Sequence, residues 1–298
     1  GRQPGCPCPV DSMVIERKWK KWVSFYIPLT AFIVGTLFPF YWMLITAIRP
    51  DSELYRSWRA PNNAPFWTLQ PTLGHFQDLM AKTTFPIWLW NTFFIAVAST
   101  AISLFCGLLA GYALARLHFP GRQVVFLLAI MALMIPTEMT IVPVFIGFLK
   151  LKLVNNYLAL ILPSLARVFI VYLFRQFFLT LPSELEDAAA IDGCNRFQSF
   201  WFIALPLARP ALIAGTILLF SNNWNAFLWP LLVMLEERWQ TLPVGVATFA
   251  PGVGNQTQIL GFGPAMAAVT LLALPSLLVF LALQRYFIEG VARTGVKG

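Results

Sequence analysis

The sequence predicts an all-α, polytopic membrane protein with six transmembrane helices. Of its 298 residues, 58% are hydrophobic and only 11% are charged, which is too apolar for an ordinary soluble domain. Several apolar stretches reach the ~20 residues that a helix needs to cross a bilayer. The net charge of +8 comes from basic residues beside these stretches. This is typical of loops held on the cytoplasmic side, so nucleic-acid binding is not expected.

The N-terminal part is expected to be a disordered tail, residues 1–15, followed by one membrane domain, residues 16–298. Pro, Gly and Cys crowd the first positions without periodicity. A charged run, ERKWKK, then precedes the first apolar stretch at about Val23–Ile48. No small-residue cleavage site follows this stretch, so we expect a retained helix rather than a signal peptide.

The other spans are separated by polar segments. Residues 49–88 are too long for a turn and are expected to form an external loop. The later spans are expected at about Asn91–Leu114, Val124–Phe148, Asn155–Phe178, Ala211–Met234 and Pro264–Ile288. Pro136, Pro143 and Pro163 fall inside the third and fourth spans, where prolines mark a bend or a cavity.

The distribution of basic residues predicts that both termini are cytoplasmic. With that orientation, thirteen basic residues fall in cytoplasmic segments and seven in external segments, with Arg167 left inside a span. Lys150 and Lys152 run against the trend, but the excess follows the positive-inside rule.

A polar, helix-forming stretch, Leu181–Pro210, interrupts the apolar pattern. Ser183 is positioned to cap a helix whose first turn is acidic, and a run of alanines continues that helix. Gly193 breaks the pattern, and a second helical pattern begins at Arg196. We expect two short helices joined at a glycine. Small residues flanked by charge suit a docking surface for another protein.

This stretch resembles the EAA loop of bacterial ABC-importer permeases, through which the membrane subunit engages its ATPase. Asp187-Ala188-Ala189 is followed after three residues by Gly193, and after nine more by Ile203-Ala204-Leu205-Pro206. Asp187 replaces the usual Glu, and Cys194 replaces a frequent Ala. The resemblance places the loop in the cytoplasm between helices four and five. It implies that the ATPase-docking residues are Glu184, Glu186, Asp187, Ala188, Ala189, Asp192, Gly193, Ile203, Leu205 and Pro206.

Two further segments resemble the carbohydrate-importing branch of this family. Ala115–Arg122 is similar to a short basic segment common there, and Asn222–Leu231 is similar to a pattern of the second permease subunit. The implied assembly contains a second homologous permease, two ATPase subunits and an extracytoplasmic solute-binding protein in the bacterial inner membrane, among membrane lipid. The resemblance implies no cofactor on this chain, with ATP and Mg on the partner ATPase.

Two charged residues, Glu138 and Arg167, are predicted to lie within the membrane. A charge near the bilayer centre costs ~2.5–3.5 kcal/mol even on the lenient insertion scale, so both should face protein or water. One interpretation pairs them with each other or with a partner subunit. A second places Arg167 on the translocation path, facing an anionic or hydroxyl-rich substrate. A proton relay is the third.

A polar cluster within the fifth span supplies the other candidates for the substrate path: Asn222, Trp224 and Asn225. These side chains either pack between helices or contact sugar, with Trp224 stacking on a pyranose face. In the loop after this span, the candidates for contact with the binding protein are Pro251, Gly252, Gly254, Asn255 and Gln256. Resemblance to maltodextrin-type importers implies that role, and a plain connector is the alternative.

The sequence contains no catalytic constellation. It lacks the G-x-x-x-x-G-K-[ST] phosphate loop, and its two histidines, His75 and His118, fall in different predicted compartments, so no metal site is expected. We therefore expect a permease subunit of an ATP-driven importer of oligosaccharides or polysaccharides, forming half of the path. Arg167 and the positive charge favour an acidic saccharide such as alginate. The alternatives are an ion- or proton-coupled secondary transporter using Glu138 and Arg167, and a membrane enzyme acting on lipid-linked sugars.

Overall fold

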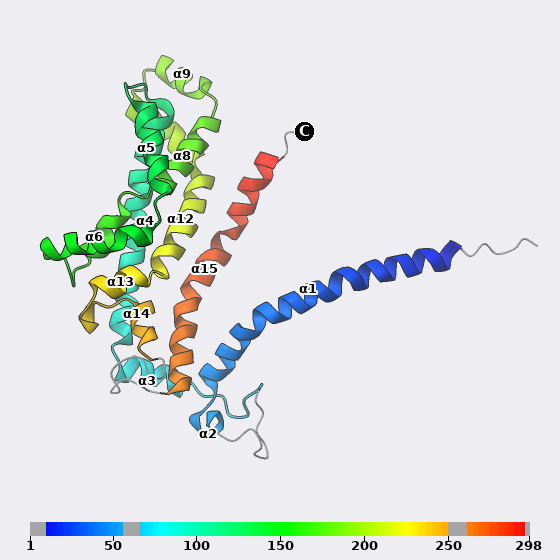
Figure 1. The fold of residues 1–298 in the computed structure, drawn as a ribbon. Helices are drawn as coiled ribbons and strands as arrows, with labels where there is room; N and C mark the ends of the chain where they lie inside the picture. The colour runs from blue at the N-terminus through cyan, green and yellow to red at the C-terminus, as the bar shows by residue number, and fades with distance from the viewer. Residues whose placement is uncertain (1–9, 56–65, 250–260, 296–298) are drawn as a thin grey trace, which may run out of the picture.

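The computed structural model describes the backbone of residues 10–55, 66–249 and 261–295, and the side chains of residues 22–55, 66–249 and 261–284. Every regular element in this part of the chain is helical (Figure 1), which confirms the all-α prediction. Within the described residues, four helices are long and apolar enough to cross a membrane, or up to six if each of two bent pairs is one span. The predicted number of six is the upper end of this range.

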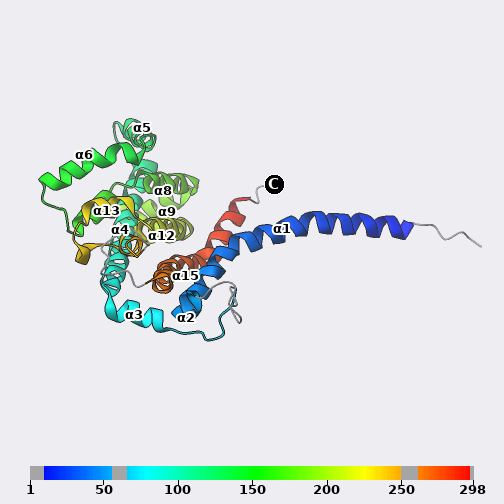
Figure 2. The same cartoon turned by 60° about the horizontal axis from the view of Figure 1, so that its bottom comes forward.

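The first helix, α1 (Val10–Ile48), extends away from the rest of the molecule (Figures 1 and 2). It begins inside the segment predicted to be a disordered tail, of which residues 1–9 lie outside the described residues. Apolar side chains along it are exposed, including Trp22 at 61% and Phe32 at 72%. Only its C-terminal end contacts the last helix, α15 (Phe262–Gly295).

The polar segment after α1 carries two short helices, α2 (Asp51–Leu54) and α3 (Gly74–Lys82). The imidazole of His75 in α3 is buried and lies 2.7 Å from the carbonyl oxygen of Arg49. This contact holds α3 against the end of α1.

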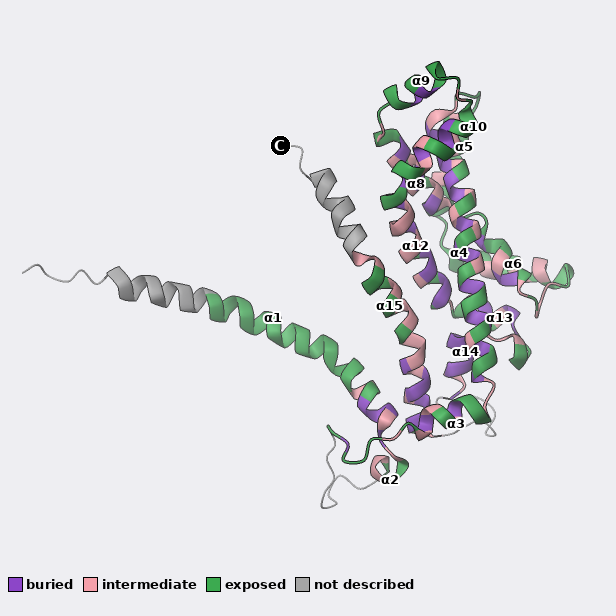
Figure 3. Ribbon diagram, turned by 180° about the vertical axis from the view of Figure 1, so that it is seen from behind, coloured by how far each residue is buried: buried purple, intermediate pink, exposed green. Residues whose placement is uncertain are grey.

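Three helices form the centre of the bundle: α4 (Phe85–Arg116), α8 (Val168–Thr180) and α12 (Arg209–Trp224). Their facing sides are buried, whereas the outer sides are exposed (Figure 3). Gly111 lets α4 and α8 approach closely, because a Cβ there would lie 2.7 Å from the Cβ of Phe174. Such close packing through small residues is common between membrane helices.

The third predicted span is sharply bent. It consists of α5 (Arg122–Leu133) and α6 (Thr137–Lys150), whose axes differ by 99°. The break falls at Pro136, which lacks an amide hydrogen and disfavours helix at the residue before it.

The fourth predicted span is also interrupted. It begins with α7 (Leu158–Ile161) and the 3₁₀ turn η1 (Leu162–Ser164), and α8 starts only after Arg167. The backbone of Arg167 is not helical, with φ −79° and ψ 86°. Pro163 lies in the 3₁₀ turn, and Leu158–Thr180 still counts as one candidate membrane span, so the sharp bend of the preceding span has no counterpart here.

The fifth predicted span, Ala211–Met234, is wrong as a single helix. Helix α12 ends at Trp224, and a separate short helix, α13 (Leu228–Val233), follows. The break comes at Asn225, whose side-chain amide donates to the carbonyl oxygen of Ser221 at 2.8 Å, because Asn competes with the backbone for such hydrogen bonds.

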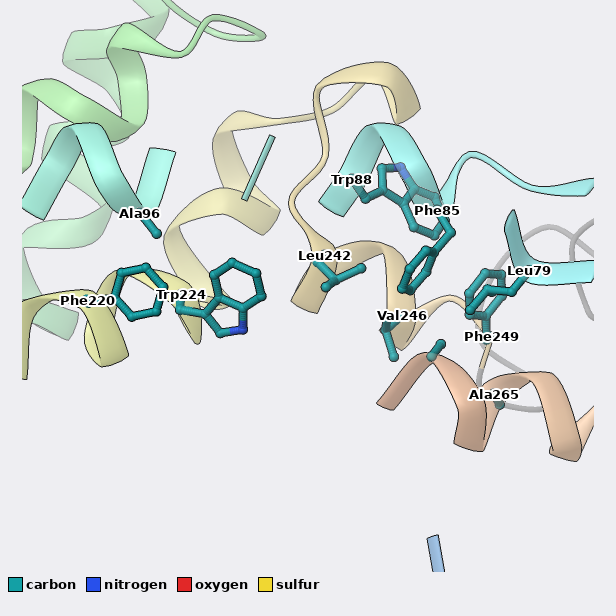
Figure 4. Packing of buried hydrophobic residues seen from close by; sticks show 11 residues of the cluster. Leu79, Phe85, Trp88, Ala96, Phe220, Trp224, Leu242, Val246, Phe249 and Ala265 are labelled. Atoms are coloured by element: carbon teal, nitrogen blue, oxygen red, sulfur yellow. The ribbon is translucent and has the colours of Figure 1, made fainter. Parts of the chain in front are cut away.

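The segment after α13 was expected to be an outer loop, and part of it is in the core instead. It contains the 3₁₀ turn η3 (Glu237–Trp239) and the buried helix α14 (Leu242–Ala247). Leu242 and Val246 belong to a core cluster with Trp88 and Trp224 (Figure 4). This cluster joins α14 to α4, α12 and the start of α15.

Candidate docking loop and membrane cavity

The loop predicted to dock the ATPase forms one end of the molecule (Figure 1). It contains α9 (Glu184–Ile191) and a second helical piece made of α10 (Arg196–Ser199), the π-helical turn η2 (Phe200–Ala204) and α11 (Leu205–Leu207). Gly193 lies between them with φ +84°, a conformation that favours glycine. The sequence-based prediction of two helices joined at a glycine is confirmed.

The helix caps differ from the prediction. Ser183 makes no side-chain cap, although its carbonyl oxygen accepts from the amides of Glu186 and Asp187 at 2.9 and 3.1 Å. The second helix instead begins with a capping box: Asn195 accepts from the amide of Gln198 at 2.9 Å, and the Gln198 side chain accepts from the amide of Asn195 at 2.8 Å. The spacing of these two residues was a usable signal in the sequence.

Burial divides the predicted docking residues into two groups. Glu186 and Ala189 are buried, and Ile203 and Leu205 are half-buried. The exposed members, which can contact another protein directly, are Glu184, Asp187, Ala188, Asp192, Gly193 and Pro206.

The buried Glu186 pairs with two arginines. Its Oε1 lies 3.2 Å from Nε of Arg116, at the end of α4, and its Oε2 lies 3.8 Å from Nη1 of Arg196. Arg116 also donates from Nη2 to the carbonyl oxygen of Leu181 at 2.5 Å. Sequence analysis assigned Glu186 to the docking surface, whereas the structure shows it facing the protein.

A cavity of about 480 Å³ opens at the surface between α6, the break before α8 and the start of α13. Glu138 from α6 and Arg167 from the break before α8 both line it, together with Thr137, Thr140, Ile141, Val144, Pro163, Ala166, Leu228 and Trp229. No ion pair joins Glu138 to Arg167 within the described residues. Glu138 and Arg167, the two charged residues predicted to lie within the membrane, therefore line the same cavity but do not form an ion pair with each other.

Arg167 is held by a chain of polar side chains. Its Nη2 donates to Oδ1 of Asn223 at 3.3 Å, and Nδ2 of Asn223 donates to the hydroxyl of Thr100 at 3.2 Å. Asn223 and Thr100 are both buried. This chain fixes the guanidinium at the cavity wall and connects it to α4.

The other candidates for the substrate path, Asn222, Trp224 and Asn225, do not line this cavity. Trp224 is 1% exposed, stacks on Phe220 and donates to the carbonyl oxygen of Leu272 at 2.8 Å. This favours the packing interpretation over stacking on a sugar. Asn222 is exposed, and Asn225 bonds to Ser276 at 3.2 Å. The five residues proposed to contact the binding protein, in the segment 251–256, lie outside the described residues.

A second hollow, of about 400 Å³, was not anticipated from the sequence. Aromatic and polar side chains from the start of α4, from η3 and from the residue before α7 line it, including Trp90, Asn91, Tyr157, Arg238 and Trp239. Asn91 is 1% exposed and donates to the carbonyl oxygens of Arg238 and Gln240, both at 2.9 Å. These bonds fix η3 to α4, so the first polar residue of the second predicted span has a structural partner.

Residues 103–293 match a family described as binding-protein-dependent transport system inner membrane component. The chain belongs to this family. It is therefore a multi-pass inner-membrane permease of the ABC-importer type and not a catalytic enzyme, as the docking-loop resemblance implied. Membership of a binding-protein-dependent family favours this assignment over an ion-coupled secondary transporter.

Curated relatives match most of the chain. An arabinooligosaccharides transport system permease protein of Halalkalibacterium halodurans is 40% identical over 266 residues, which cover 88% of this chain and 91% of the relative. A lactose transport system permease protein of Rhizobium radiobacter is 32% identical, covering 89% and 92%. An sn-glycerol-3-phosphate transport system permease protein of Yersinia pestis is 33% identical, covering 89% and 94%.

Among solved structures, the fold is similar to a bacterial ABC transporter involved in the import of the acidic polysaccharide alginate. The TM-score is 0.78 at 21% identity, covering 96% of this chain and 100% of that chain. A second structure, of a bacterial alginate transporter in complex with an alginate pentasaccharide-bound periplasmic protein, gives a TM-score of 0.56 at 16% identity. At these identities the likeness concerns the fold.

Proposed function

We propose that this chain is a permease subunit of an ATP-driven importer of oligosaccharides or polysaccharides, and that it forms half of the translocation path. The relatives named for arabinooligosaccharides and lactose support a saccharide substrate. The proposed assembly contains a second, homologous permease, two ATPase subunits that bind ATP and Mg, and an extracytoplasmic solute-binding protein. Both termini are proposed to be cytoplasmic.

The observation that carries the proposal is the exposed surface of α9 at the end of the bundle. Ala188 and Gly193 expose backbone that another protein can approach, and Glu184, Asp187 and Asp192 surround it with negative charge. Such a surface fixes a partner through close contact and complementary charge. We propose that it docks the ATPase, which moves residues 181–206 when ATP closes the nucleotide-binding pair.

The cavity beside Arg167 is the proposed place of the substrate. A guanidinium binds a carboxylate through two parallel hydrogen bonds, and Asn223 already holds one edge of this group. This geometry supports the finer proposal that the importer accepts an acidic saccharide. Transport then requires that the two conformations of the cavity bind the substrate differently.

The docking proposal is tested by the ATPase activity of the complex in lipid, co-expressed with its neighbouring genes. Ala188→Trp adds bulk to the exposed face of α9. We expect it to abolish co-purification of the ATPase and stimulation by the loaded binding protein. Gly147→Trp adds comparable bulk to α6 at a position with open space around it and serves as the matched control. Wild-type stimulation in the Ala188 variant would refute docking at α9.

The substrate proposal is tested with binding protein loaded with neutral or acidic oligosaccharides. Arg167→Ala is expected to lose stimulation by the acidic sugar and to keep that by the neutral sugar, whereas Arg167→Lys keeps the charge and part of the response. An equal loss for every sugar would assign Arg167 a structural role.

A further inference from the structure

The end of α4 is the place where the docking loop meets the transmembrane bundle. Arg116, in the last turn of α4, contacts Glu186 of α9. Tyr112, one turn earlier on the same helix, packs its ring against Phe200 of η2 with centroids 5.0 Å apart. Side chains four residues apart lie on the same helical face. One face of α4 therefore holds both halves of the docking loop.

The two contacts differ in kind. The aromatic contact is part of a large apolar cluster, since Tyr112 also packs edge-on against Phe178 of α8 at 5.4 Å. Helix α9, by contrast, has its main helix contact with α10 and projects beyond the spanning helices (Figure 1). The side chains of Arg116 and Glu186 are only 12% and 9% exposed. Their ion pair is thus a direct, largely enclosed connection between α9 and α4.

Arg116 has a different role from its basic neighbours. Arg122 and Arg175 donate to the carbonyl oxygens of Leu117 and Leu114, at 3.1 and 3.3 Å, as basic residues commonly do at a helix C-terminus. Arg116 alone among these three pairs with a carboxylate, and it also bonds to Leu181, where α8 ends. It therefore joins three elements: α4, α8 and α9.

We infer that Arg116 is a positioning residue, and that its ion pair with Glu186 transmits movement of the docked α9 to the spanning helix α4. This inference rests on the proposed function, because it assumes that an ATPase moves the loop. The pair lies behind the exposed docking face, so breaking it leaves Glu184, Asp187 and Ala188 free to bind the partner. Docking and transmission are therefore separable.

The test uses Arg116→Gln, Glu186→Gln and the double variant in the full importer complex. Each single variant breaks the enclosed Arg116–Glu186 pair and leaves Glu186 at most its longer contact, 3.8 Å, with the exposed Arg196. We expect binding-protein-stimulated ATPase activity to fall by about tenfold or more. Co-purification of the ATPase and its basal activity should stay within about twofold of wild type, since the docking face is intact. The double variant should be no worse than the single variants, because both act on one interaction.

Two controls separate transmission from general destabilisation. Lys82→Gln breaks an exposed ion pair with Asp78, whose atoms are 2.7 Å apart, and should leave stimulation unchanged. Arg116→Lys keeps the charge but has fewer donors, and should recover part of the stimulation. Stimulation that stays near wild type in both single variants would overturn the inference, and so would a basal activity that falls in parallel with it.

A cross-link provides a second route that does not depend on the stability of these variants. Cysteines replacing Arg116 and Glu186, in a chain without its native cysteines, can be joined by a short thiol cross-linker. Joining them should restore stimulation in the same sample that lacked it, and a failure to restore it would overturn the inference. A wild-type complex that the binding protein does not stimulate would instead contradict the proposed function itself.

Discussion

The turn at Gly193 combines a positive φ with open space around the residue. These two properties can be tested separately. Gly193→Val should disrupt the turn, because a β-branched residue with φ near +84° is strained by roughly 1–2 kcal/mol. Gly193→Asn has a similar size but tolerates this conformation. We expect the Val variant to lose binding-protein-stimulated ATPase activity and the Asn variant to keep it, and equal activities would show that the turn conformation is unimportant.

Asn223 offers a second test at the residue scale. Asn223→Asp places a carboxylate next to Arg167, where it can form an ion pair with the guanidinium and compete with an acidic substrate. The concentration of acidic saccharide–loaded binding protein needed for half-maximal ATPase stimulation should then rise by about tenfold, since a charged hydrogen bond is worth ~1.5–3 kcal/mol. The response to the neutral sugar should change little. Asn156→Asp adds the same charge outside the cavity and preserves the cap on Leu158, so it should have no such selectivity.

Sequence reasoning identified Arg167, Glu138 and the docking loop because each departs from its surroundings in charge or spacing. It missed the partners of these residues. Asn223 and Arg116 look like ordinary members of a polar cluster and a basic turn, and only the packing of distant helices brings them to Arg167 and Glu186. The burial of Trp224 was missed for the same reason, because it depends on the packing of α12 against α15.

At the scale of elements, the contact between α4 and α8 should be sensitive to volume. A Cβ at Gly111 would lie 2.9 Å from the backbone nitrogen of Arg175 as well as against Phe174, and backbone cannot move aside easily. Gly111→Val should lower the free energy of unfolding by about 1–3 kcal/mol through overpacking. Thermal unfolding of the purified chain in detergent measures this.

Gly147→Ala in α6 is the matched control, because nothing lies within 4 Å of a Cβ there. Replacing glycine by alanine inside a helix usually stabilises it slightly. An equal loss of stability in both variants would mean that close packing of α4 on α8 does not explain the effect at Gly111.

The helices were predicted with uneven success for a physical reason. Apolar length came close to the starts of α4 and α15, which begin at Phe85 and Phe262 rather than at the predicted Asn91 and Pro264. It could not show that the chain turns at Asn225 or that Leu242–Ala247 enters the core. Six apolar residues are too few to signal a span, although they suffice to cover the ring of Trp88.

At the scale of the whole molecule, α9 and α3 lie at opposite ends of the bundle (Figure 1). The positive-inside rule predicts that the α9 end faces the cytoplasm. In a chain without native cysteines, Asp192→Cys should therefore react with a membrane-impermeant thiol reagent only in inside-out vesicles. Asp78→Cys in α3 should react only in intact spheroplasts. Labelling of both from the same side would contradict the proposed topology.

The anchoring of the chain on either side of residues 250–260 has a mechanical consequence. Phe249 is 2% exposed and packs against Trp88, and on the far side the amide of Phe262 donates to the hydroxyl of Tyr55 at 3.0 Å. Phe249 follows α14 and belongs to the core, whereas Phe262 begins α15 and is held by a bond at the surface. A protein that binds residues 250–260 and moves them would therefore exert force on α14 and α15 at the same time. Through these helices the force would reach the core that they share with α4 and α12.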